Sequence, residues 1–90
     1  MPTINFTSNL KRFYPDLAPV QVEGKTVVAA LAEVEKNYTG LRNYILDENG
    51  GVREHVNIFI GNDMIQDRQN LLDELSASDE VYIMQAISGG

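Results

Sequence analysis

The residues at the end of the chain are suited to the activation of a carboxylate. They read Ala86-Ile87-Ser88-Gly89-Gly90. Because glycine has no Cβ, a Gly-Gly segment can pass through a narrow channel and adopt backbone angles closed to other residues. We therefore expect Gly90 to be adenylated, and we expect a partner enzyme to recognise the preceding residues, Ala86, Ile87, Ser88 and Gly89. The alternative is a frayed terminus or a cloning remnant.

No other group of residues predicts catalysis. The chain has no cysteine, which excludes disulfides, thiolate metal sites and a cysteine nucleophile. His55 is the only histidine, and we interpret it as an ordinary surface residue because no second soft ligand or nucleophile accompanies it. There is also no P-loop, dinucleotide fingerprint, catalytic triad or HExxH helix. The sequence predicts a protein with no catalytic residues, no metal and no permanently bound cofactor.

Strands are indicated where apolar and polar residues alternate. The clearest alternation, at His55–Ile60, places Val56 and Ile58 on one face and Phe59 on the other. In the last segment the alternation directs Tyr82 and Met84 outward. The predicted strands are Pro2–Thr7, Val20–Glu23, His55–Ile60, Met64–Ile65 and Glu80–Ile87.

One substantial helix is predicted after Thr26, whose hydroxyl can cap the first turn. Its apolar face consists of residues at spacings of four, three and four, namely Val27, Leu31, Val34 and Tyr38. We expect Gly40 to end this helix in the left-handed conformation. Two short helical turns are also expected, at Leu41–Asp47 and at Leu71–Leu75.

These elements predict the α+β class, with one main helix covering one face of a mixed four- to five-stranded sheet. The first and last strands are both apolar, so we expect them to lie parallel at the centre of the sheet, joined by a crossover that includes the helix. That arrangement is the β-grasp, or ubiquitin-like, fold. We expect residues 1–86 to form a single domain and residues 87–90 to form a flexible Gly-Gly tail.

The sheet face opposite the helix is the second candidate site. Phe59, Tyr82 and Met84 are expected to project from it, and large apolar side chains of this kind are common in protein interfaces. We therefore predict a partner-binding surface there. The alternative is that residues 10–19 cover these three side chains.

The charge of the chain is −6 and is unevenly distributed. Residues 1–45 contain five basic and four acidic side chains, for +1, whereas residues 46–90 contain two and nine, for −7. Nucleic-acid binding is not expected, because phosphate contacts need a basic stripe. The acidic half is interpreted either as a docking surface for a basic partner or as a solvated surface. No apolar run is long enough to span a membrane, and no signal peptide is evident, so we expect a soluble cytoplasmic protein.

The whole chain resembles the ubiquitin-like sulfur carriers of the MoaD/ThiS type. This group includes the small subunit of molybdopterin synthase and the carriers used in thiazole and cysteine biosynthesis, and the block around His55-Val56-Asn57 looks closest to the cysteine-biosynthesis type. The resemblance is carried by Leu41–Asp47, His55–Ile60, Asp79-Glu80-Val81 and the C-terminal Ala86-Ile87-Ser88-Gly89-Gly90.

The resemblance implies a non-catalytic protein cosubstrate that is monomeric when alone. In this family an E1-like activating enzyme uses ATP to adenylate the C-terminal glycine, here Gly90. The product is converted to a thiocarboxylate, which gives its sulfur to an acceptor synthase in molybdopterin, thiamin or cysteine biosynthesis. The resemblance leaves the pathway open. The alternative is a ubiquitin-like modifier that is joined through Gly90 to lysines.

Overall fold

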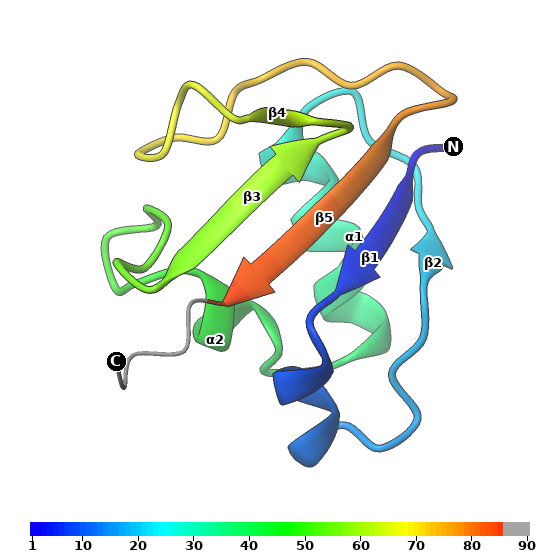
Figure 1. The fold of residues 1–90 in the computed structure, drawn as a ribbon, viewed down its shortest axis with the longest axis vertical. Helices are drawn as coiled ribbons and strands as arrows, with labels where there is room; N and C mark the ends of the chain where they lie inside the picture. The colour runs from blue at the N-terminus through cyan, green and yellow to red at the C-terminus, as the bar shows by residue number, and fades with distance from the viewer. Residues whose placement is uncertain (86–90) are drawn as a thin grey trace.

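The fold is built on one five-stranded mixed sheet, seen in the computed structural model, which describes residues 1–85 (Figure 1). The strand order is β2-β1-β5-β3-β4. β1 and β5 pair in parallel at the centre, and the other neighbours are antiparallel. The elements are β1 (Thr3–Phe6), the 3₁₀ helix η1 (Ser8–Arg12), β2 (Val20–Gln21), α1 (Val27–Asn37), α2 (Arg42–Ile45), β3 (Val56–Ile60), β4 (Asp63–Met64) and β5 (Glu80–Gln85). The predicted sheet, with its central parallel pair, is confirmed.

The core lies between α1 and one face of the sheet. Strand residues on this face alternate with outward ones, so Ile4 of β1, Ile58 of β3 and Ile83 of β5 are all almost completely buried. The buried residues of α1 are Val27, Ala30, Leu31 and Val34. Figure 1 shows α1 behind the sheet, which leaves the opposite face, here called the outer face, uncovered by a helix.

The main helix begins as predicted and ends slightly earlier. The Thr26 hydroxyl accepts a hydrogen bond from the backbone N–H of Ala29 at 3.3 Å, which confirms the predicted N-cap. The helix ends at Asn37. Gly40 has the expected left-handed backbone, with φ of +88°, but it belongs to the turn that leads into α2. The predicted helical turn at Leu41–Asp47 is confirmed as α2 (Arg42–Ile45).

The predicted helical turn at Leu71–Leu75 is wrong. This segment is irregular, and its backbone groups bind the chain at the start of α1 instead. The carbonyls of Asp73 and Leu71 accept hydrogen bonds from the N–H groups of Val27 at 3.0 Å and Val28 at 2.9 Å. Because the first amides of a helix have no partner within it, these two carbonyls satisfy donors that would otherwise be unpaired.

Strand limits differ from the predictions by one or two residues. His55 lies outside β3, and β4 is Asp63–Met64 rather than Met64–Ile65. Ile65 follows this strand and is buried in the core. The segment between β1 and β2 contains the 3₁₀ helix η1, which buries Leu10. The described part of the last strand ends at Gln85.

Candidate partner-binding site

The residues predicted to react lie outside the described part of the chain. Gly90 and the recognition segment Ala86, Ile87, Ser88 and Gly89 belong to residues 86–90, so the flexible tail predicted at 87–90 stays a prediction. The structure does place the residue that precedes this segment. Gln85 is the last residue of β5, and it pairs with Val56 at the start of β3. The surfaces around this end of the sheet are therefore the ones that a tail-binding partner would meet.

The outer face presents the three side chains that the sequence predicted to point outward. Phe59 of β3 lies directly opposite Tyr82 of β5 in the antiparallel register, and Met84 lies opposite Asn57. Tyr82 is 36% exposed, Met84 is 46% exposed and Phe59 is half-buried. Their outward orientation is confirmed, and their role in binding a partner stays a prediction.

The segment at residues 10–19 does not remove these side chains from solvent. Leu10 and Leu17 are buried in the core, and the hydroxyl of Tyr14 donates a hydrogen bond to the carbonyl of Thr39 at 2.8 Å. This bond ties the segment to the turn after α1. In Figure 1 the chain after η1 runs toward β2 and away from β3 and β5. The expected alternative, a loop covering the outer face, is therefore wrong for Tyr82 and Met84.

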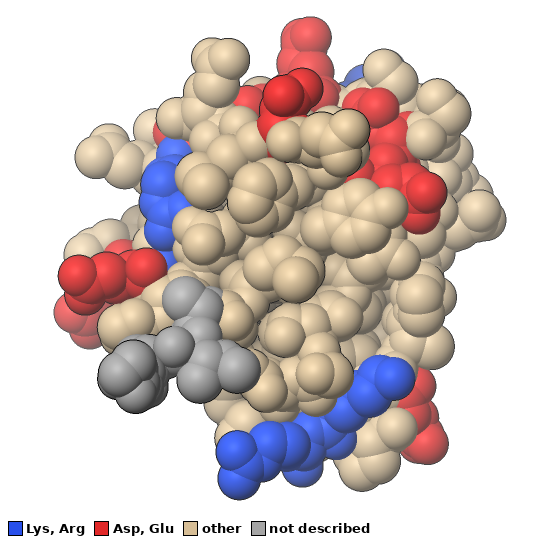
Figure 2. Space-filling view, viewed as in Figure 1, with Lys and Arg blue, Asp and Glu red and all other residues tan. Residues whose placement is uncertain are grey.

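The centre of the outer face carries few charges, as the space-filling view shows (Figure 2). Acidic side chains gather near the start of β5, where the Glu80 carboxylate accepts a hydrogen bond from the Asn5 amide at 3.3 Å. Basic side chains border the opposite, lower end. An apolar centre with a charged border resembles the core and rim of a protein interface.

Arg68 fixes one border of the outer face, a role that the sequence alone does not predict. Its guanidinium donates to the carbonyls of Val56 at 2.8 Å and Arg53 at 3.0 Å, and to the side chain of Asn57 at 3.3 Å. These bonds hold the start of β3 beside Met84. No spacing in the sequence indicates them, because the loop that carries Arg68 reaches β3 only in the folded protein.

Four aspartates of the acidic half have structural roles in turns. Each side chain accepts hydrogen bonds from backbone N–H groups within its own loop, at distances of 2.7 to 3.4 Å. For Asp67, hydrogen bonds from backbone amides, that of Asn70 first, hold the pKa below its ordinary value. These acidic side chains thus stabilise loops, in addition to contributing to the charge of −7. The four residues are Asp47, Asp67, Asp73 and Asp79.

Two further features of residues 1–85 bear on function. The structure of this part of the chain brings together no group of three metal-ligating side chains, and His55 is exposed. Within the same residues, no helix is long and apolar enough to cross a membrane.

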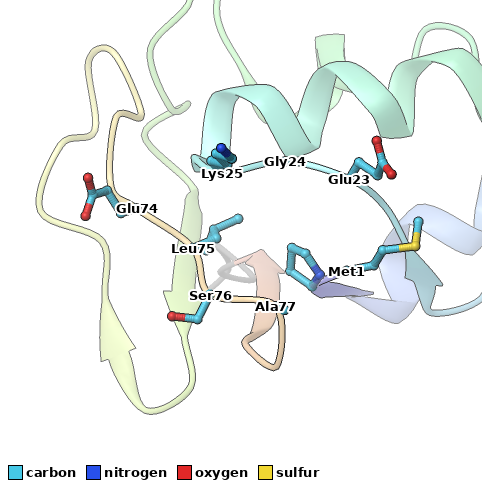
Figure 3. A pocket seen from close by; sticks show the side chains of 9 residues that line it. Met1, Glu23, Gly24, Lys25, Glu74, Leu75, Ser76 and Ala77 are labelled. Carbon is cyan, nitrogen blue, oxygen red and sulfur yellow. The ribbon is translucent and has the colours of Figure 1, made fainter.

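A cavity of about 740 Å³ lies at the end of the sheet away from Gln85 (Figure 3). It is open to solvent, and it is bounded by Met1, Pro2, the segment 23–25 and the segment 74–77. Leu75 and Pro2 contribute apolar lining, while the charged groups of Glu23 and Lys25 lie at the upper margin of the cavity in Figure 3. Since this cavity is at the start of β5, it is separate from the end at which the tail continues.

Comparison with solved structures establishes the class of fold. A chain of the Amycolatopsis orientalis BexX/CysO complex matches with a TM-score of 0.87 over 100% of both chains at 20% identity. Mycobacterium tuberculosis CysO matches with a TM-score of 0.84 at 22% identity, over 97% of this chain and 100% of that one. SAMP1 from Haloferax volcanii gives 0.77 at 21% identity, over 99% and 98%. The fold is the β-grasp, as predicted.

The family follows from the sequence comparison. The model of the ThiS family matches residues 5–90, so this chain belongs to the ThiS family. The sulfur carrier protein CysO of Mycobacterium tuberculosis is 27% identical over 73 residues, which are 79% of this chain and 78% of that protein. CysO of Mycobacterium bovis matches equally well. These matches confirm the prediction that the chain is a member of the ubiquitin-like sulfur-carrier family and is similar to CysO.

Proposed function

We propose that this chain carries sulfur as a thiocarboxylate on Gly90, as a cosubstrate of partner enzymes and without catalytic residues of its own. The observation that carries the proposal is the match to the ThiS family, which runs through Gly89 and Gly90. The β-grasp domain supports it, because β5 leads directly to that segment.

The proposed activation consumes one ATP. An oxygen of the Gly90 carboxylate bonds to the α-phosphorus while the bond from that phosphorus to the β-phosphate oxygen breaks, and pyrophosphate leaves. A hydrosulfide ion then attacks the carbonyl carbon of the acyl-adenylate. The bond from this carbon to the AMP oxygen breaks, so AMP leaves with one of the original carboxylate oxygens. Loss of the S–H proton gives the thiocarboxylate.

The catalytic groups for these steps belong to an E1-like adenylating enzyme and, later, to a sulfur-acceptor synthase. This chain supplies the reactive carboxylate, the tail and a surface that positions them. The outer face with Phe59, Tyr82 and Met84 is suited to that positioning, because Tyr82 and Met84 are exposed and lie on the strand that leads to the tail. Likeness to CysO proteins favours cysteine biosynthesis over the molybdopterin and thiamin routes. We expect this ATP-dependent reaction to take place in the cytoplasm.

Removal of Gly89 and Gly90 is expected to abolish activation and leave the domain folded. The buried core residues lie between Ile4 and Ile83, so the truncation removes no core contact among the described residues. ATP–pyrophosphate exchange with the cognate adenylating enzyme measures activation, and urea unfolding measures the fold. Lys25→Ala, at the far end of the domain, is the matched control and retains exchange. If the truncated chain supports exchange at the wild-type rate, the proposed function is wrong.

A second candidate function is conjugation to other proteins through an isopeptide bond from Gly90 to lysine. Likeness to SAMP1, whose full name is small archaeal modifier protein 1, favours this candidate. The adenylation step is the same for both functions, so the product distinguishes them. Intact-mass measurement of the protein isolated from its own cells is expected to show one oxygen replaced by sulfur. Covalent adducts with other proteins, without that replacement, would favour the modifier instead.

A further inference from the structure

Two exposed aromatic rings form a second apolar surface. Phe13, at the C-terminal end of η1, stacks on Tyr44 of α2 with ring centroids 4.8 Å apart and an interplanar angle of 19°. Phe13 is 56% exposed and Tyr44 is 40% exposed, so both exceed the 36% of Tyr82 on the outer face. Large aromatic side chains at the surface are enriched in the energetically important centres of interfaces. We call this pair, together with the neighbouring basic residues Lys11, Arg12 and Arg42, the η1–α2 surface.

The stacked pair is held in place by aromatic and polar contacts behind it. Tyr14 lies edge-on to Tyr44 at 6.1 Å and to Tyr38 at 6.2 Å, and Tyr38 lies edge-on to Phe6 of β1 at 6.3 Å. The pKa of Tyr14 is raised, mainly by desolvation and to a smaller extent by its neighbours Tyr44 and Glu35. The Tyr14 hydroxyl donates a hydrogen bond to the carbonyl of Thr39 at 2.8 Å. A surface fixed in this way loses little conformational entropy on binding.

Basic side chains predominate around the pair, and the nearby Glu35 carboxylate is occupied by the backbone N–H groups of Gly40 and Arg42. Lys11 and Arg12 are exposed in the last turn of η1, and Arg42 lies in α2. The Arg53 guanidinium is held against α2, because its Nε donates to the carbonyl of Asn43 at 2.8 Å. Four of the seven basic residues of a chain with charge −6 thus belong to this surface or adjoin it. This charge is complementary to an acidic partner, and it is opposite to the docking charge that the sequence suggested.

The surface lies at the end of the sheet where the tail begins. Figure 1 shows η1 and α2 at the end toward which the β5 arrow points. The strand register places the surface at the same end. Phe6, the last residue of β1, pairs with Ile83 near the end of β5 and packs its ring against Tyr38. An enzyme that takes Gly90 into its active site must therefore approach this end of the domain.

We propose that the η1–α2 surface docks the adenylating enzyme through an acidic segment of that enzyme that carries an aromatic or apolar anchor. The anchor contacts the Phe13 and Tyr44 rings, and the acidic groups face Lys11, Arg12 and Arg42. This inference rests on the proposed function. A second copy of this chain is a poorer occupant, since two basic borders would meet. Single-stranded nucleic acid would also suit the rings and cations, but the position of this surface at the end of the sheet toward which β5 points favours the adenylating enzyme.

Steady-state ATP–pyrophosphate exchange, with the full-length chain as the varied substrate of its cognate adenylating enzyme, tests the inference. Phe13→Ala and the double variant Lys11→Glu, Arg12→Glu are each expected to raise KM about tenfold with kcat unchanged. Added salt is expected to raise the wild-type KM and to affect the double variant less. Controls, expected to keep the wild-type KM, are Leu72→Ala, at an exposed apolar residue away from this end, and Lys25→Glu, which reverses a single charge elsewhere.

The charge variant keeps the test decisive even if Phe13→Ala disturbs the fold, because Lys11 and Arg12 are exposed. Wild-type KM values in both variants would overturn the docking inference and leave the proposed function standing. Absence of exchange with the wild-type chain would overturn the proposed function and the inference together. Self-association through Phe13 in analytical ultracentrifugation, or Phe13-dependent binding of a labelled single-stranded oligonucleotide, would assign the surface to another occupant and also overturn the inference.

Discussion

Gly24 has the closest contact with α1 of the glycines in the described chain. A Cβ placed on Gly24 would lie 2.8 Å from the backbone nitrogen of Ala30 and 2.9 Å from its Cα. Real Cβ atoms essentially never lie this close to a non-bonded heavy atom, and backbone atoms of a helix cannot move aside easily. The chain can therefore pass from β2 into α1 along this path only because residue 24 has no side chain.

Gly24→Ala is expected to lower the free energy of unfolding by about 1–3 kcal/mol, because the methyl group must displace the chain or α1. Urea unfolding followed by circular dichroism measures the loss. Glu23→Ala changes an exposed neighbour and is expected to stay within about 0.5 kcal/mol of the wild type. Equal stability of Gly24→Ala and the wild type would show that the segment is not packed against Ala30 in solution.

Individual residues of the candidate site differ in how far the sequence could identify them. Tyr82 and Met84 were identified because strand alternation depends only on neighbouring residues. Phe13 and Tyr44 were not identified, because they come from different elements and meet only when η1 packs beside α2. Apolar residues of this kind in a single sequence look like ordinary core residues, and only their exposure distinguishes them.

At the scale of elements, the segment Leu71–Leu75 shows where periodicity fails as a signal. Its leucines have the spacing of a helical turn, yet Leu71 adopts φ of +55° and is fully buried. The backbone here is used by another element, since its carbonyls bind the first amides of α1 and Leu75 N–H donates to the carbonyl of Lys25 at 2.8 Å. Such tertiary hydrogen bonds are absent from any local pattern. The long, well-capped α1 was predictable because its determinants are local.

Two carboxylates that accept hydrogen bonds from backbone amides of turns and loops make the free energy of unfolding depend on pH in the acidic range. Glu35 of α1 accepts from the backbone N–H of Gly40 at 2.7 Å and of Arg42 at 3.0 Å, which lowers its pKa. Asp67 accepts from the amides of its loop, and its pKa is also lowered. In both residues the folded protein favours the charged form. Each therefore stabilises the fold above its ordinary pKa, and this contribution is lost as pH falls through the lower, folded value.

The free energy of unfolding is accordingly expected to fall with pH below about 4, the ordinary range of these groups. Asp67→Asn and Glu35→Gln should each reduce the stability at neutral pH and flatten the decline in acid. Urea unfolding across a series of pH values measures both effects. Glu54→Gln, at an exposed carboxylate, is the control and should keep the wild-type slope. An unchanged slope in both test variants would contradict this assignment of the pKa shifts.

At the scale of the whole molecule, the sequence correctly predicted the sheet. The charge of each half of the sequence, in contrast, did not predict which charges gather on one surface. Two apolar strands at the ends of the chain indicated a central parallel pair, which a right-handed crossover through α1 can connect. Net charge by halves of the sequence, however, does not describe a surface. Four aspartates of the acidic half bind loop amides, and basic residues from three segments gather at the η1–α2 surface.

The central pairing of β1 with β5 also governs when the protein can become functional during its synthesis. Residues 3–6 have their parallel partner at residues 80–83, so the middle of the sheet is incomplete until those residues have been made. Contacts of such large sequence separation form late and cooperatively. A ribosome-bound or prematurely terminated chain that lacks β5 lacks the strand that joins β1 to β3. The topology thus makes formation of the central sheet depend on the synthesis of residues 80–83, far along the chain from β1.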